Sequence, residues 1–308
     1  MPRRALLVWN PTAGRRPARR RRQLQQLTQG LQGGGWQVGV AETDPVSGAR
    51  SAAARGVDAG CDVIIGCGGD GTLHEIVQVL AETPANQAPA LAVAPPWGTA
   101  NIMACALGVP PSAAKAAAWL LQAQARPAAL GVATTPAGRR YFVAVASVGF
   151  DASIVHGVQP AAKRRWGKLA FVGAAATAWP RYFPAQLEYD CGDRRGAADA
   201  VLIGLTRFYG GRLRLGRVGP TGDAIQLALR GGPWLLPVQA LGLLTRGLEY
   251  APGVERLGPD PVAVLTPGLP VQLDGEAAGL TPVTFAVEPG RLRLWCYCPP
   301  PLSAAMRS

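Results

Sequence analysis

The sequence predicts a doubly wound α/β domain followed by an all-β sandwich. Strand and helix patterns alternate up to about residue 125, and from there short apolar runs alternate with turn residues. The chain has 308 residues, 48% of them hydrophobic, which is enough for two hydrophobic cores. We therefore expect an α/β domain over 1–127, a β-sandwich domain over 128–298 and a tail, 299–308, that packs back on the first domain.

In the first part, apolar runs rich in β-branched residues alternate with segments whose apolar residues recur at helical spacing. The expected strands are 5–10, 36–43, 62–67 and 90–94, and the expected helices are 15–31, 49–59, one that follows Gly71, 99–107 and 112–122. This order is typical of a mainly parallel sheet covered by helices, which binds ligands beyond the carboxyl ends of its strands.

In the second part, short strands are separated by turn signals, as in a sandwich. The expected strands are 141–147, 186–189, 200–205, 224–229, 262–265, 271–273, 283–287 and 292–297. Two helical segments, 167–178 and 235–248, interrupt them.

Composition excludes several classes of protein. No apolar run reaches the length of about 18 residues that crosses a bilayer. The amino-terminal residues run into a strand pattern without a signal-peptide cleavage site, so we expect a cytoplasmic protein. The six cysteines form no CxxC pair, which indicates neither a zinc site nor a disulfide framework.

The net charge of +12 favours an anionic partner. The basic residues gather in two clusters, one with Arg15, Arg16, Arg19, Arg20, Arg21 and Arg22 and one with Lys163, Arg164, Arg165 and Lys168. We expect no nucleic acid partner, because no known binding module and no interleaved aromatic residues accompany these clusters. Anionic phospholipid fits the charge equally well. An arginine excess that reflects coding bias is the alternative.

Special residues follow every strand of the first part. They are Asn10 to Gly14, Thr43, Gly68 to Thr72 and Pro96 to Asn101, and the strand order brings all four to one cleft. The stretch GCGGDGTLHEIVQVL sets four glycines around Asp70 at the start of a helix. Bare backbone amides at a helix amino terminus form a site for phosphate. A turn with a purely structural purpose is the alternative.

Two known phosphate motifs do not account for this loop. Gly66 to Gly71 satisfies GxGxxG, but it lies on the third βα turn, and the next strand ends in Ala94-Pro95-Pro96 without the acidic residue that binds ribose. No GxxxxGK[ST] sequence occurs. The pairing of GGDGT with a second glycine-threonine loop indicates a nucleoside triphosphate held between two turns.

Five motifs in order carry a resemblance to a known family. They are Asn10-Pro-x-x-Gly14, Gly68-Gly-Asp-Gly-Thr-Leu-His-Glu75, Gly98-Thr-Ala-Asn101, Gly149-Phe-Asp-Ala152 and Leu273-Asp-Gly-Glu276. Together they resemble the diacylglycerol kinase catalytic-domain family, which includes bacterial lipid kinases and sphingosine kinases. NAD kinases and phosphofructokinases share GGDG-type loops, but the first and last motifs are similar to the lipid branch. The resemblance covers nearly the whole chain and implies an ATP-binding α/β domain, a lipid-binding β-sandwich and an active site between them.

The resemblance also implies site residues. The implied ATP site consists of Asn10, Pro11, Thr12, Ala13, Gly14, Thr43, Gly68, Gly69, Asp70, Gly71, Thr72, Leu73, His74, Glu75, Gly98, Thr99 and Asn101. Asp70 would orient Mg²⁺ or the γ-phosphate in catalysis. Its alternative role is a helix-capping carboxylate, and Glu75 could serve only to solvate its helix.

Asp274 and Glu276 are the paired carboxylates that an alcohol nucleophile needs. One would accept the hydroxyl proton, and the other would tune its partner's pKa or reach the metal. The resemblance places the proton acceptor in this element. We prefer Glu276 to Asp274, and a solvated hairpin tip is the alternative.

The chain departs from the family pattern at three places. Ile102 stands where some members have aspartate, and His74 replaces the commoner asparagine. The segment that binds a structural Mg²⁺ in some bacterial members retains one acidic residue, Asp223, so retention of this metal site is in doubt.

The leading hypothesis is a lipid kinase that uses ATP and Mg²⁺ to phosphorylate diacylglycerol or another long-chain alcohol. A kinase of a soluble acceptor, such as NAD or a sugar, is the rival, and a nucleotide-binding regulatory protein that has lost phosphotransfer is the third hypothesis. An apolar tunnel lined by the segments around Phe150 and 234–244 would favour lipid, and a polar pocket would favour a soluble substrate.

A lipid acceptor requires contact with a membrane surface. We expect Lys163, Arg164, Arg165 and Lys168 to dock on anionic phospholipid at the inner face of the membrane, with the apolar segment 169–179 entering the interface. A solvated basic helix start is the alternative. Whether the chain forms a homodimer is left open.

Overall fold

The computed structural model describes residues 2–14, 16–157, 173, 186–218 and 224–297. Several segments named above lie outside the described residues. They are the basic cluster at 163–168, Asp223, the tail at 299–308 and the segments 167–178 and 169–179, of which only Gly173 is described. Within the described part, no helix combines the length and the apolar character needed to cross a bilayer.

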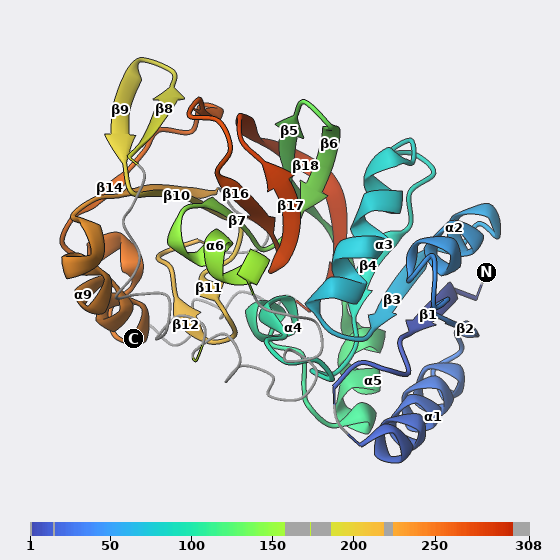
Figure 1. The fold of residues 1–308 in the computed structure, drawn as a ribbon. Helices are drawn as coiled ribbons and strands as arrows, with labels where there is room; N and C mark the ends of the chain where they lie inside the picture. Colours follow the sequence, from blue (N-terminus) through green and yellow to red (C-terminus); the bar gives the residue numbers. More distant parts are fainter. Residues whose placement is uncertain (1, 15, 158–172, 174–185, 219–223, 298–308) are drawn as a thin grey trace, which may run out of the picture.

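The amino-terminal part is a parallel sheet between two pairs of helices, as the sequence predicts. Its strands stand in the order β2-β1-β3-β4. They are β1 (Arg4–Trp9), β2 (Gln37–Glu42), β3 (Val63–Cys67) and β4 (Ala90–Val93). The helices are α1 (Pro17–Gly33), α2 (Arg50–Asp58), α3 (Asp70–Glu82), α4 (Ile102–Leu107) and α5 (Ala113–Gln122). Helix α1 packs with α5 and α2 with α3, on opposite faces of the sheet (Figure 1).

The carboxyl-terminal part is an all-β sandwich, which confirms the predicted fold class. A six-stranded antiparallel sheet has the order β14-β13-β10-β7-β16-β17. Its strands are β7 (Val145–Val148), β10 (Ala200–Gly204), β13 (Ile225–Leu229), β14 (Val254–Arg256), β16 (Pro270–Leu273) and β17 (Glu276–Leu280). It faces a second layer made of β5 (Gln124–Thr135), β6 (Gly138–Phe142), β8 (Leu187–Cys191), β9 (Arg194–Ala198), β15 (Val262–Val264) and β18 (Val283–Cys296).

Several element predictions were wrong in detail. The two strands expected at 283–287 and 292–297 form one strand, β18, with an irregular register between Glu288 and Leu292. The strand expected at 141–147 is divided between β6 and β7. Pro289 and Gly290 resemble a turn signal, although β18 continues past them. The apolar run 141–147 contains no turn signal, and it divides where the amides of Val143 and Ala144 donate to Asp274, a residue distant in the chain. Helix α6 (Phe150–Gly157) and the short hairpin of β11 (Phe208–Tyr209) and β12 (Leu213–Arg214) were not expected.

Strand β18 joins the two parts of the molecule. Leu294 pairs in parallel with Leu91 of β4, and most of β18 pairs antiparallel with β5. The parallel sheet therefore continues into the sandwich layer as one hydrogen-bonded sheet. The expected boundary after residue 127 falls inside β5, and the division into two domains stays a prediction.

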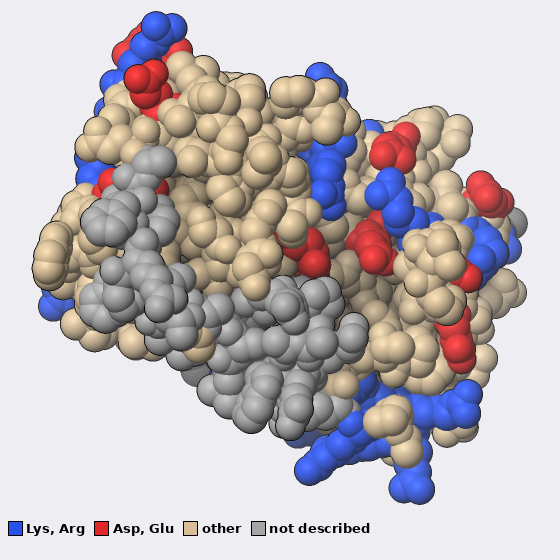
Figure 2. All heavy atoms as spheres, viewed as in Figure 1, with Lys and Arg blue, Asp and Glu red and all other residues tan. Residues whose placement is uncertain are grey.

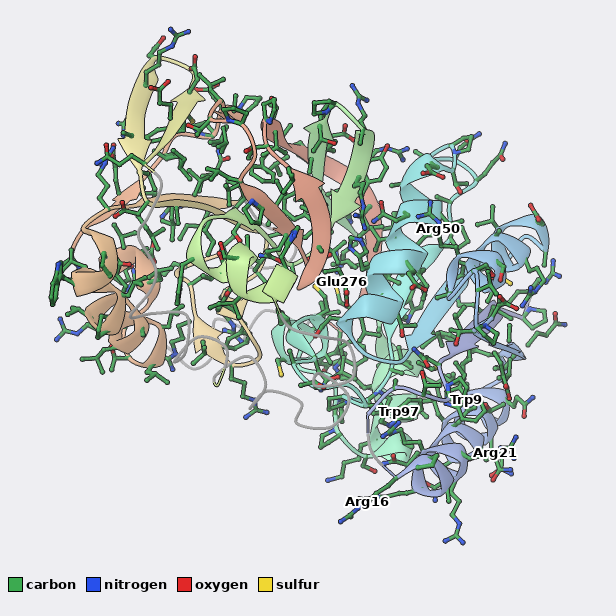
Figure 3. The ribbon with its side chains drawn as sticks, viewed as in Figure 1. Trp9, Arg16, Arg21, Arg50, Trp97 and Glu276 are labelled. Carbon is green, nitrogen blue, oxygen red and sulfur yellow. The ribbon has the colours of Figure 1, made fainter. Side chains whose placement is uncertain are left out.

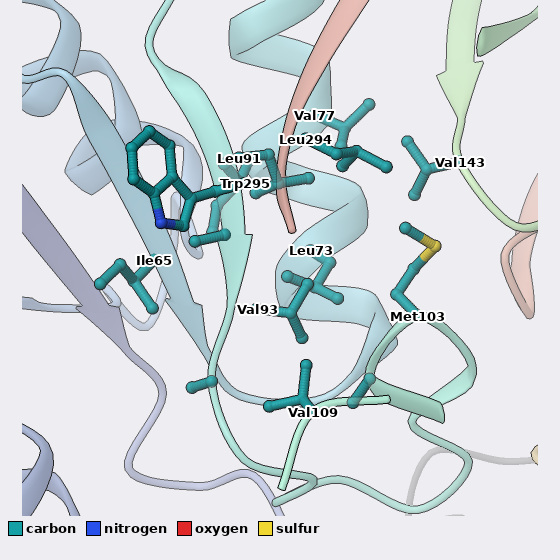
Figure 4. Close-up of a cluster of buried hydrophobic side chains, with 14 of the residues drawn as sticks. Ile65, Leu73, Val77, Leu91, Val93, Met103, Val109, Val143, Leu294 and Trp295 are labelled. Carbon is teal, nitrogen blue, oxygen red and sulfur yellow. The ribbon is translucent and has the colours of Figure 1, made fainter. Parts of the chain in front are cut away.

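Buried apolar side chains fill both sides of this junction. Figure 4 shows Leu73, Val93, Met103 and Leu294 in one cluster with Val143, which follows β6. Inside the sandwich, Phe142 and Phe285 meet edge to face with 6.3 Å between ring centroids. Packing of this kind fixes the first residues of α3 and α4 against the sandwich.

Candidate active site

Three loops touch at the carboxyl ends of β1, β3 and β4, at positions that only glycine fits. A Cβ atom on Gly98 would lie 2.5 Å from the Cα of Gly69, and one on Gly14 would lie 2.2 Å from the carbonyl oxygen of Trp97. Such distances are shorter than any normal contact. Absent side chains thus let the loops pack backbone to backbone.

Asparagine side chains fix the shapes of two of these loops. Asn10 donates from Nδ2 to Thr72 Oγ1 over 3.2 Å and accepts the amide of Thr12 over 3.0 Å. Asn101, in the left-handed region with φ 52°, accepts the amide of Gly98 and donates to its carbonyl oxygen, both over 2.7 Å. These side chains therefore shape the loops, while Thr99 is exposed between them.

Asp70 lies at the first turn of α3 and holds the start of another helix. Its Oδ1 accepts the amide of Ile102, the first residue of α4, over 2.8 Å. Burial and, after it, the nearby carboxylate of Asp274 raise the pKa of Asp70 to about 6, although hydrogen bonds from the backbone amides of residues 101–103 oppose the rise. The carboxylate thus caps a helix, as the structural alternative proposed, although the helix is α4.

The side chains that follow the glycine loop contact other parts of the protein. Leu73 lies in the core, and the amide of Ala49 at the start of α2 donates to the carboxylate of Glu75. His74 is buried, with Nδ1 3.3 Å from Asp274 Oδ2 and Nε2 3.2 Å from a guanidinium nitrogen of Arg140. An ATP-binding role for these three side chains stays a prediction.

Asp274 is a buried carboxylate that binds the backbone amides of a neighbouring loop. It is 5% exposed and occupies the tight turn between β16 and β17 with φ 53°. Its two oxygens accept the amides of Val143, Ala144 and Val145 over 3.0, 2.8 and 3.0 Å. With His74 as a further neighbour, Asp274 pins the loop between β6 and β7 to this turn.

Glu276 lies at the other end of the same turn and meets the glycine loop. A Cβ atom on Gly71 would lie 3.0 Å from Glu276 Oε1. Figure 3 shows Glu276 beside the amino-terminal turn of α3. The structure thus brings the GGDGT loop and the DGE turn together, although they come from opposite ends of the chain.

A hydrogen-bond network under the turn was not found from the sequence. Asp151 Oδ2 accepts from Ser147 over 2.6 Å, from Tyr209 over 3.0 Å and from Gln272 Nε2 over 3.4 Å. Gln272 Oε1 in turn accepts the amide of Gly275 over 2.8 Å. Burial raises the pKa of Asp151 and, with the adjacent carboxylate, that of Tyr209. The only sequence signal was the Gly149-Phe-Asp-Ala152 motif, to which no role was assigned.

One arginine of the first basic cluster differs from the others. Arg20 is buried, and a Cβ atom on Gly14 would lie 2.7 Å from one of its guanidinium nitrogens, so the cation lies behind the loop from Asn10 to Gly14. Arg16 and Arg21 are instead exposed at the start of α1 (Figure 3), and the guanidinium of Arg21 lies over the ring of Trp9, 5.7 Å from its centroid. The sequence treated all six as one surface cluster, whereas the structure assigns Arg20 to the candidate site.

No side-chain cluster of the described residues could enclose a metal alone, since none groups three or more His, Cys, Asp or Glu. Mg²⁺ in phosphate-transfer sites usually relies on one or two carboxylates, waters and the phosphates themselves. Asp70, a carboxylate beside the glycine loop, fits this pattern of binding.

Comparisons with known proteins point to one family. Residues 4–133 match the family pattern described as the diacylglycerol kinase catalytic domain. A diacylglycerol kinase of Bacillus subtilis (strain 168) is 32% identical over 211 residues, which are 68% of this chain and 67% of that protein. One from Staphylococcus saprophyticus is 28% identical over 213 residues, 68% of this chain and 67% of that protein. The crystal structure of a diacylglycerol kinase from Bacillus anthracis superposes with a TM-score of 0.73 at 18% identity, over 96% of this chain and 97% of that one, and supports the fold.

Proposed function

Because the chain belongs to the diacylglycerol kinase catalytic-domain family, we propose that it transfers the γ-phosphate of ATP, with Mg²⁺, to the hydroxyl of diacylglycerol or a related long-chain lipid alcohol. Family membership alone makes the chain a lipid kinase, a phosphotransferase that acts on an alcohol group. The relatives do not favour a soluble acceptor such as NAD or a sugar.

The proposal is carried by the contact between Glu276 and Gly71. A phosphate held by the amides around Gly71 would have the carboxylate of Glu276 within reach. A general base must lie within hydrogen-bonding distance of the proton that it removes. This juxtaposition is what in-line transfer to an alcohol requires.

At the phosphate end, the amides of residues 68–72 and the positive end of α3 would bind the triphosphate. The buried cation of Arg20 adds positive potential behind the first loop. Asp70 would hold Mg²⁺ together with the phosphates, and the metal would offset charge on the γ-phosphate.

At the acceptor end, we assign the base to Glu276. The hydroxyl oxygen forms a bond to the γ-phosphorus, the bond to the β,γ-bridging oxygen breaks, ADP leaves, and the hydroxyl proton passes to the Glu276 carboxylate. Asp274 already accepts three amides, so its role would be to hold the turn that presents Glu276.

A lipid acceptor also implies a membrane. Docking through Lys163, Arg164, Arg165 and Lys168 on anionic phospholipid at the inner face of the membrane concerns residues outside the described part and remains a proposal. A homodimer likewise remains open.

The test is phosphorylation by radiolabelled ATP of detergent-dispersed diacylglycerol, sphingosine, NAD and glucose, with Mg²⁺ or with EDTA. We expect Mg²⁺-dependent label in diacylglycerol, and a loss of about 100-fold or more in the variant Asp70→Asn, which keeps an acceptor for the Ile102 amide. Label in NAD or glucose without label in any lipid would overturn the proposal.

A further inference from the structure

Helix α9 (Gly232–Leu244) exposes several large apolar side chains. It has no charged residue, and its one buried residue is the polar Gln239. Trp234 is 87% exposed, Leu244 68% and Leu241 56%. An apolar tunnel lined by this segment would have favoured a lipid acceptor, and in the structure these side chains instead face outward. A surface helix normally has the opposite arrangement.

Gln239 fixes this orientation. Its Nε2 donates to the carbonyl oxygens of Arg230 and Pro252 over 3.1 and 3.3 Å, which anchors the helix to the end of the sandwich. With Gln239 facing inward, Trp234, Val238 and Leu241 follow one outward stripe at spacings of four and three residues. The exposed apolar face therefore results from a specific polar contact.

Arginines border this face. The hairpin of β11 and β12 packs beside α9, and Arg214 donates to the carbonyl oxygen of Thr245 over 3.4 Å. The segments 207–217 and 231–247 contain no acidic residue. Their exposed arginines are Arg207, Arg212, Arg214, Arg217 and Arg246. In Figure 2 the surface over α9 is mostly uncharged, with Lys or Arg and some Asp or Glu at its margin.

We propose that α9 and this arginine border, which we call the α9 face, dock on an anionic lipid bilayer. An exposed tryptophan and leucines on a helix, with cations beside them, match an interfacial helix that inserts its apolar side while the cations meet lipid phosphates. A second copy of the chain fits less well, because symmetric pairing of the α9 face would bring arginine borders of the same charge together.

The α9 face is connected to the acceptor end of the candidate site. The same hairpin contacts α4, and Tyr209 of β11 donates to Asp151, whose network holds the turn beside Glu276 (Figure 1). Docking would therefore hold a bilayer against the element that supports the proposed base. The choice of a bilayer as the occupant rests on the proposed lipid acceptor.

The test is binding to vesicles of phosphatidylcholine with about 30% phosphatidylglycerol, compared with phosphatidylcholine alone. We expect the triple variant Trp234→Ser, Leu241→Ser, Leu244→Ser to bind anionic vesicles at least about tenfold more weakly, since each buried side chain contributes a substantial transfer free energy. Arg212→Gln with Arg246→Gln should weaken binding and reduce its salt dependence.

The matched control changes exposed apolar residues elsewhere. Val46, Leu265 and Leu280 are 96%, 48% and 53% exposed and lie outside the α9 face. Their replacement by serine should leave vesicle binding unchanged. Quenching by brominated lipid gives a direct readout, and the quenching should diminish in Trp234→Phe. Equal vesicle binding by the triple variant, the control and the wild type would overturn the proposal.

Two further measurements distinguish bilayer docking from the proposed kinase function and from self-association. Activity on detergent-dispersed diacylglycerol should stay within about twofold in the triple variant, because the α9 face does not touch the reacting groups. If the chain does not phosphorylate lipid but its vesicle binding still depends on α9, only the proposed function is refuted. A solution dimer that the triple variant dissociates, in the absence of vesicle binding, would assign the α9 face to self-association and overturn the bilayer proposal.

Discussion

At the scale of single residues, the candidate site contains carboxylates with different environments. Asp274 is buried and accepts three backbone amides, whereas Glu276 is partly exposed and faces Gly71. Asp151 is enclosed by hydroxyl and amide donors below the same turn. These environments suggest three separable roles, namely holding the turn, accepting a proton and supporting the network.

Substitution of Glu276 and substitution of Asp274, the two carboxylates of the turn, should have different effects on kinetics and stability. Glu276→Gln should lower kcat with little change in the KM for ATP, because a base acts in the chemical step. Asp274→Asn should also lower kcat, and it should reduce the free energy of unfolding by about 1 to 3 kcal/mol, since an amide cannot accept all three backbone donors.

Steady-state kinetics and urea unfolding of both variants check this pair. If Asp274→Asn were as stable as the wild type, the holding role of Asp274 would be wrong. If Glu276→Gln retained normal kcat, the base would have to be another group.

Asp151 should make stability depend on pH. Burial raises its pKa in the folded chain above the ordinary value of about 3.9. The folded state therefore keeps this proton in a range of pH in which the unfolded chain has lost it, and the free energy of unfolding falls as pH rises from about 4 through the raised pKa. Asp151→Asn keeps an acceptor without the charge, so it should lose less stability over this range.

Urea unfolding of the wild type and Asp151→Asn at a series of pH values measures this difference. If the free energy of unfolding changed with pH in the same way in both proteins, Asp151 would not be the cause of the pH dependence. Asp190→Asn, a change at a surface ion pair, provides a control for general charge effects.

At the scale of elements, loops meet through glycine backbones and helices begin on carboxylates from elsewhere. Gly98 packs on Gly69, Asp70 caps α4, and Glu75 accepts the amide of Ala49 beside α2. The glycine loop is thereby tied to two neighbouring helices, so its shape depends on elements that follow and precede it in the chain.

Gly98→Ala should disturb nucleotide binding more than the fold. The new Cβ would lie 2.5 Å from Gly69, so the two loops must separate. We expect the KM for ATP to rise by about tenfold or more, which corresponds to about 1.4 kcal/mol of lost binding. The control is Gly33→Ala at the end of α1, where nothing lies within 4 Å of the added atom. Equal KM values in the two variants would contradict the loop packing.

At the scale of the whole molecule, β18 makes one sheet from the two parts. It pairs with β4 of the parallel sheet and with β5 and β15 of the sandwich layer. The carboxylate turn and the phosphate loop are therefore held in a fixed relation by paired backbone as well as by side-chain packing.

We expect the chain to unfold in one transition. Separation of the two parts would break the ladder of β18 and expose the cluster around Met103, Val143 and Leu294, so neither part should melt alone. Calorimetry should give one peak with equal calorimetric and van't Hoff enthalpies. Two resolved peaks, or a stable fragment after limited proteolysis within β5, would contradict this expectation.

The sequence by itself determined most of the order of strands and helices, the α/β-then-sandwich architecture and the place of the glycine loop at the end of β3. These features follow from local signals, since hydrophobic periodicity and runs of glycine act over neighbouring residues. The tertiary structure alone decided that Asp274 turns inward while Glu276 meets Gly71, that Arg20 lies behind the first loop, and that α9 faces outward with its apolar side. Each depends on partners distant in the chain, namely the amides of residues 143–145, the backbone of Gly14 and two carbonyl oxygens that flank α9. The direction of a side chain is set by the burial and hydrogen bonding that such partners provide, and a linear pattern does not contain that information.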